Sequence, residues 1–180
     1  MVRASLINKY KLWERDIMGE KVIIKIAKTH FDLSFEMLEK MIQQCPDDLW
    51  NEKKGGFVFW QQLLHALTGI NYWLREENRK FIEPFEDKKV YPELDHDPEN
   101  NLTKEELTEY KNIVKEICEA FFQDKDDQWI NSNSIIYDKM KNLDVIFMQI
   151  RHIQYHVGHC NSILRENNVQ AVEWLDYFGE

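Results

Sequence analysis

The sequence predicts an all-α protein, a four-helix bundle with long crossover connections, and three observations support this fold class. Apolar residues recur at helical spacing in four long segments. Two of the connections between those segments are themselves long. With 43% apolar residues, a chain of 180 residues can bury a core without a disulfide or a second domain. We therefore expect one domain over residues 1–180.

The first two helices follow from their apolar spacing. Apolar positions from Ile24 to Ile42 keep a helical period, and Pro46 ends that segment. The charged, glycine-terminated stretch 47–56 is typical of a connecting loop. From Phe57 to about Arg79 the chain is apolar on most sides of a helical cylinder, so this second helix should be central.

The third helix is preceded by an irregular connection. Residues 81–101 hold three of the four prolines and many acidic residues, and a crossover loop of this length is expected to cover something. Thr103 and Glu106 have the spacing of a capping box, which starts a helix that should run to about Phe122.

The last part of the chain should contain a polar connection, a helix and a packed tail. Residues 124–142 are interpreted as a connection, in which only Ser134–Tyr137 could be extended. A fourth helix is expected from about Asp144 to Arg165. The tail 169–180 carries several large apolar residues, so it should pack on the helices.

Composition excludes several classes of protein. The formal charge of −9 opposes the phosphate neutralisation that nucleic-acid binding requires. No stretch approaches the roughly 20 apolar residues that span a bilayer, and residues 1–10 are too polar for a signal peptide. Three cysteines without C-x-x-C spacing indicate a reducing compartment. We expect a cytoplasmic protein that binds neither nucleic acid nor membrane.

Three of the six histidines lie on one side of the fourth helix. At about 100° per residue, His152, His156 and His159 fall in one stripe, with apolar residues before and after them. An unsatisfied buried imidazole costs about 1–3 kcal/mol, so hydrogen bonds, an ionised partner or a metal ion must satisfy these rings. An i, i+4 pair that faces a helical core favours metal, because two ring nitrogens can then reach one ion.

The fourth helix cannot complete such a site alone. About 10.5 Å of helix rise separates His152 from His159, so the three rings cannot converge comfortably on one ion. His65, a polar residue within the apolar second helix, is the obvious additional donor. His30 is interpreted as a surface or half-buried residue and His96 as solvated in the acidic loop, so both are set aside.

Together these residues resemble the DinB/YfiT-like metalloprotein superfamily over roughly residues 20–178. The features that carry the resemblance are His65 in the second helix, the motif His152-x-x-x-His156 in the fourth, the turn Cys45–Trp50 and the closing segment Glu173–Leu175. The order and spacing of these features, rather than any single motif, are what is similar.

The resemblance implies a four-helix bundle in which His65, His152 and His156 bind a divalent metal, zinc or nickel, with open coordination positions facing a cleft. Relatives include bacillithiol- and mycothiol-dependent transferases and isomerases, often dimeric. Where relatives often read His-Arg-Gly-Gln, this chain has His156-Val157-Gly158-His159. His159 is left open as a ligand, a hydrogen-bond partner of a ligand or a residue of the cleft wall.

Three functions remain open on the sequence. The first is a metal-dependent thiol S-transferase or hydrolase, in which the ion activates a low-molecular-weight thiol or water. The second is a non-catalytic metal-binding stress-response protein with a closed four-ligand site. In the third, no metal binds and the histidines are hydrogen-bonded core residues. No catalytic residue beyond the metal ligands can be named, and the resemblance leaves a homodimer open as the assembly.

Overall fold

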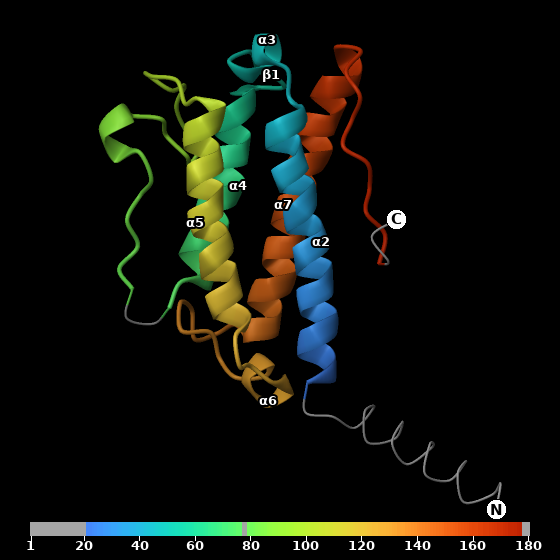
Figure 1. The fold of residues 1–180 in the computed structure, drawn as a ribbon. Helices are drawn as coiled ribbons and strands as arrows, with labels where there is room; N and C mark the ends of the chain where they lie inside the picture. Colours follow the sequence, from blue (N-terminus) through green and yellow to red (C-terminus); the bar gives the residue numbers. More distant parts are fainter. Residues whose placement is uncertain (1–20, 77–78, 178–180) are drawn as a thin grey trace, which may run out of the picture.

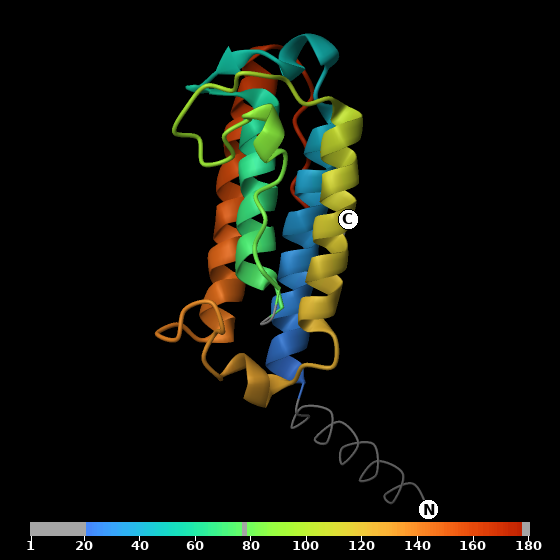
Figure 2. The same cartoon turned by 90° about the vertical axis from the view of Figure 1, so that its left-hand side faces the viewer.

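The computed structural model describes residues 21–76 and 79–177 and has an all-α fold with one small two-stranded sheet. Its long helices lie side by side along their lengths, as the two views in Figures 1 and 2 agree. These helices are α2 (Val22–Gln44), α4 (Phe59–Leu74), α5 (Lys104–Phe122) and α7 (Asn142–Glu166). The four helical segments expected from apolar spacing are therefore confirmed.

Apolar burial explains why these helices pack as they do. Helix α4 packs on both α5 and α7, and α2 packs on α7. Trp60, Leu64 and Leu67 of α4 are completely buried, which confirms its predicted central place. Each fully buried large apolar side chain stabilises the fold by about 1.5–3 kcal/mol relative to exposure.

The start of α4 corrects the sequence prediction. The stretch 47–56 is not a plain loop, because it holds the one-turn helix α3 (Asp47–Trp50) and the strand β1 (Lys53–Lys54). Strand β1 pairs in antiparallel fashion with β2 (Phe57–Val58) across a turn at Gly55 and Gly56, whose φ angles are +64° and +99°. Glycine tolerates these angles without strain, so the chain turns into a hairpin before the helix begins.

The end of α4 is also earlier than predicted. The helix stops at Leu74 rather than near Arg79, because Arg75 adopts an extended backbone with ψ of 153°. Residues 77 and 78 lie outside the described residues.

The proline-rich connection covers α4, as expected of a crossover loop of this length. It contains the short 3-10 helix η1 (Glu86–Lys88) and is otherwise irregular. Gln61 of α4 donates through Nε2 to the backbone oxygens of Val90, Tyr91 and His96, at 3.2, 2.9 and 2.9 Å. One buried amide therefore fixes the middle of this connection to the central helix.

The later elements agree with the sequence in most respects. The capping box at Thr103 and Glu106 is present at the start of α5. Residues 124–142 are a connection that includes the short helix α6 (Asp127–Ile130), and Ser134–Tyr137 form no strand.

The tail packs on the helices through only some of its apolar residues. Val172 is buried, and both its backbone N–H and its C=O are hydrogen-bonded to the side chain of Asn161. Leu175 packs against the core, but Trp174 is 71% exposed, which the composition of the tail did not predict. Phe178 and residues 1–20, including the stretch considered for a signal peptide, lie outside the described residues. Within the part of the chain that is described, no helix is long and apolar enough to cross a membrane.

Candidate metal centre

Three imidazoles from two helices meet between α4 and α7. His65 comes from α4, and His152 and His156 come from successive turns of α7. One ring nitrogen of each residue lies within 4.8 Å of the others, and the ring centroids are 4.8 Å apart in every pair. The structure thus brings together the three histidines that the resemblance selected.

A backbone carbonyl fixes the tautomer of His65. Its Nδ1 lies 2.7 Å from the carbonyl oxygen of Pro92. A carbonyl oxygen can only accept, so Nδ1 carries the proton and Nε2 keeps its lone pair. The crossover connection therefore orients one imidazole with a nitrogen free to bind a cation.

His152 occupies space left by a glycine on the facing helix. A Cβ atom added to Gly69 of α4 would lie 2.8 Å from Cε1 and 3.0 Å from Nδ1 of His152. Gly69 is helical and does not need glycine for its backbone angles. Its small size is what lets the ring of His152 approach α4.

His156 is the most deeply buried of the three. Its residue surface is 4% exposed, and its Nδ1 has no hydrogen-bond partner among the described residues. The buried side-chain amide of Gln62, one turn before His65, and Oε1 of Gln149, one turn before His152, also lack partners. Such atoms are rare in folded proteins, and a water molecule or another polar group would satisfy them.

Burial keeps His152 and His156 neutral. Desolvation, reinforced by His65, lowers the pKa of His152 from 6.5 to about 4. Desolvation and the neighbouring imidazoles lower the pKa of His156 to about 3. Neutral imidazole is the form that ligates metals, so neither ring needs to lose a proton at neutral pH to bind one.

The geometry fits a divalent ion. Three nitrogens bonded to one ion at about 2.1 Å lie about 3.4–3.6 Å from one another, so a pair that is up to 4.8 Å apart has to close by about 1.2–1.4 Å. Imidazole nitrogen suits zinc, nickel, copper and iron, and the donor set does not choose among them. His65, His152 and His156 can therefore hold an ion after small side-chain rotations.

One side of the three-histidine cluster faces a pocket of about 420 Å³. His65 and His152 line this pocket, whereas His156 does not and lies behind them. The rest of the wall consists of polar, aromatic and other residues from α4, α7 and the crossover connection: Thr68, Gly69, Tyr72, Trp73, Phe81, Glu93, Met148 and Gln149. A small molecule in this pocket would reach the cluster from its open side.

The other histidines lie outside this cluster. His159 is one turn beyond His156 on α7, where its Nε2 occupies the position that a Cβ of Gly55 would take. It packs under the hairpin turn and is not among the grouped ligand atoms. His30 is exposed with its ring 5.6 Å from that of Tyr177, and His96 is exposed beside Asp95.

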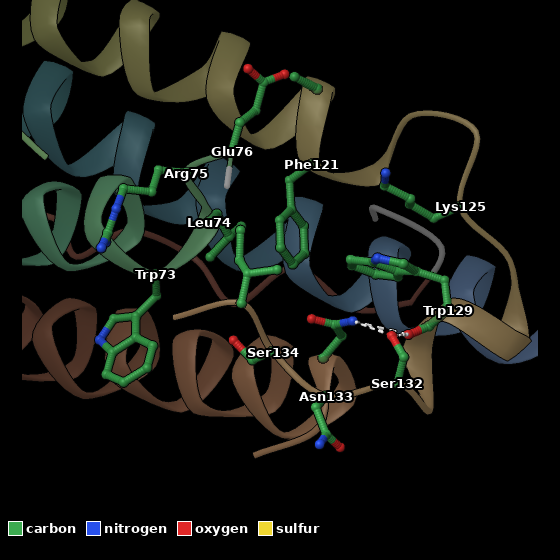
Figure 3. Close-up of a pocket in the computed structure, with 13 residues that line it drawn as sticks. Trp73, Leu74, Arg75, Glu76, Phe121, Lys125, Trp129, Ser132, Asn133 and Ser134 are labelled. Atoms are coloured by element: carbon green, nitrogen blue, oxygen red, sulfur yellow. Dashed lines mark hydrogen bonds between the residues drawn. The ribbon is translucent and has the colours of Figure 1, made fainter. Parts of the chain in front are cut away.

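A second, larger pocket of about 540 Å³ lies at the α6 end of the helices, away from the histidine cluster. Figure 3 shows Phe121 and Trp129 facing one another there, with ring centroids 5.0 Å apart. Asn142 donates to the backbone oxygen of Trp129 and to Ser132 Oγ, so its amide is already satisfied. No histidine is among the described residues that line this pocket.

The residues that hold the histidine rings in place were not identified from the sequence. No sequence pattern marks Gly69 or the carbonyl of Pro92, because their roles depend on which helix or loop faces them in the fold. A signal did exist for Gln149, since it lies three residues before His152 and therefore near the same side of α7.

No family model matches this chain, and neither the curated proteins nor the solved structures contain a match.

Proposed function

We propose that this protein is a metal-dependent enzyme, a thiol S-transferase or a hydrolase, whose divalent ion is zinc or nickel held by His65, His152 and His156. The observation that carries the proposal is the convergence of these three imidazoles at the wall of an open pocket. The burial of His156 adds to it, because desolvation lowers the pKa of this ring to about 3 and keeps it in the neutral form that binds metal.

The ion, when bound, would supply a positive charge that three neutral ligands do not compensate and that lowers the pKa of a low-molecular-weight thiol or water. Pro92 holds His65 in the tautomer that presents Nε2. Gly69 lets His152 approach α4, and His156 is the buried member of the cluster. The pocket gives a small molecule access to the ion beside His65 and His152.

An open, catalytic site is favoured over a closed, structural one. A structural zinc site has four protein ligands. The nearest candidate for a fourth is His159, whose ring is packed against Gly55 at the hairpin. A non-catalytic metal-binding stress-response protein would need that ring to turn inward.

The proposal includes membership of the DinB/YfiT-like superfamily and its four-helix bundle. The helix order supports it, and so does the origin of the cluster, which takes His65 from α4 and His152 and His156 from α7. A cytoplasmic location and a homodimer belong to the same proposal.

Metal analysis tests the site directly. We expect about one equivalent of zinc or nickel in the full chain purified without a histidine tag, and its loss in His65→Ala and in His152→Ala. His30→Ala, which removes an exposed histidine on α2, is the matched control and should retain the metal. Undiminished metal in both ligand variants would exclude the site.

Activity is tested with a panel of cellular thiols against one chromogenic electrophile, and with an activated ester for hydrolysis. We expect turnover that a chelator abolishes and zinc or nickel restores. Turnover that persists in His65→Ala would exclude the metal mechanism. Stoichiometric metal without any turnover would instead favour the stress-response alternative.

A further inference from the structure

The pocket beside the three-histidine cluster has an aromatic wall. Tyr72, Trp73 and Phe81 line it, and the ring of Tyr72 meets those of Phe81 and Trp73 edge to face at 5.2 and 5.4 Å. Met148 adds an adaptable apolar side chain from α7. Such a wall favours a flat, apolar molecular body.

A buried hydrogen-bond acceptor belongs to a residue of the pocket wall. Gln149 is 1% exposed, lines the pocket and has no donor to its Oε1 among the described residues. This oxygen lies beside His152, because both approach the position of a Gly69 Cβ. The oxygen is covered, so a ligand N–H group would reach it after a rotation of the Gln149 side chain and would then satisfy an unfavourable buried carbonyl.

An acidic side chain belongs to the pocket wall. Glu93 lines the pocket from the crossover connection, and no lysine or arginine is among the described residues that line it. Other acidic residues of the same connection lie near Glu93. Burial raises the pKa of Glu83, and the negative charges of Glu86, Glu93 and Asp95 raise it further. The guanidinium of Arg75 stacks on the ring of Tyr72 and lines the other pocket.

We propose that this pocket selects a small molecule with an aromatic body and a protonated amino group, which donates to Gln149 and is attracted by Glu93. This inference rests on the proposed function, because it takes the pocket as the substrate site of the metal centre. Glu93 would attract an ammonium group and repel a carboxylate placed beside it. The selection therefore concerns the class of molecule brought to the ion and not the reaction itself.

Calorimetric titration of the full chain with three probes of similar shape tests this selection. The probes are 2-phenylethylammonium, 2-phenylethanol and 3-phenylpropionate. The chain is titrated with each probe first after treatment with a chelator and again after zinc is added. The metal-free titration is needed because a carboxylate could otherwise bind the ion. We expect the ammonium to bind best after chelation. Equal binding of the three probes, or a preference for the carboxylate, would overturn the inference.

Two variants separate the contributions of charge and hydrogen bonding. Glu93→Gln changes an exposed residue and should lower ammonium affinity by up to about fivefold, with no effect on the alcohol. Gln149→Leu removes the unpartnered carbonyl and should lower ammonium affinity roughly two- to tenfold. Unchanged affinity in both variants would overturn the inference.

Matched controls use the same substitutions away from the pocket. Glu116→Gln removes one charge from the exposed face of α5, and Gln154→Leu removes an amide of α7 that donates to Ser34 instead. Both should bind the ammonium as the parent chain does.

Metal content measured on the same samples separates the two proposals. Ammonium selectivity that depends on Glu93 in a protein without metal would support the pocket assignment and reject the metal-dependent function. Metal binding combined with carboxylate preference after chelation would reject the pocket assignment alone.

Discussion

Gly69→Ala should weaken metal binding without altering any ligand. The new Cβ would lie 2.8 Å from Cε1 of His152, and ordinary contact begins near 3.4 Å. The ring must therefore move by at least about 0.6 Å, which exceeds the roughly 0.5 Å within which such sites hold their geometry. We expect metal affinity to fall about tenfold or more, the range seen when groups supporting a ligand are changed.

Fold stability should respond in the opposite direction. Alanine is favoured over glycine within a helix by up to about 1 kcal/mol, and the ring of His152 can turn away when no ion holds it. The melting temperature of the metal-free variant should therefore be unchanged or higher by about 2–4 °C.

Gly158→Ala is the matched control for this experiment. Gly158 lies within α7 between two histidines, and nothing lies within 4 Å of the position of its Cβ. It should gain similar helix stability and keep its metal affinity. Zinc competition with a chromogenic chelator measures both variants, and equal affinity in Gly69→Ala and Gly158→Ala would refute the role assigned to Gly69.

Three further predictions concern stability. The pKa values of His152 and His156 are lowered to about 4 and about 3, so below pH 6.5 the unfolded chain binds protons that the folded chain does not. As the pH falls below 6.5, the free energy of unfolding of the metal-free protein should decrease by up to about 1.4 kcal/mol per pH unit for each ring. A urea midpoint that stays constant from pH 7.5 to 5 would contradict this. Gly55→Ala places a side chain at φ of +64° and against His159, so urea unfolding should show a loss of about 1 kcal/mol or more. Thr103→Ala removes the cap of α5 and should cost about 1 kcal/mol in the same assay, whereas a serine at this position should restore it.

The helices could be predicted because their signals are local. A capping box such as Thr103 with Glu106 is satisfied within one turn of chain, and apolar spacing depends only on the helical repeat. The hairpin before α4 escaped prediction, because Phe57 and Val58 continue the apolar pattern of the helix. Pairing with Lys53 and Lys54 across two glycines decided their conformation instead.

The candidate site could be predicted in part for a similar reason. The placement of His152 and His156 on one side of a helix follows from their spacing. That His159 would pack under Gly55 could not be known, because it depends on where the hairpin lies over α7. That Oε1 of Gln149 has no donor depends on which side chains surround it in the folded chain, and its spacing in the sequence does not show this.

The amino-acid sequence alone determined that helices form and that two imidazoles share one face of α7, since both follow from the rise and repeat of a single helix. Only the tertiary structure decided that His65 completes the group. That outcome depends on how α4 is aligned along α7 and on a carbonyl from the crossover connection, which are set by packing between segments far apart in the chain.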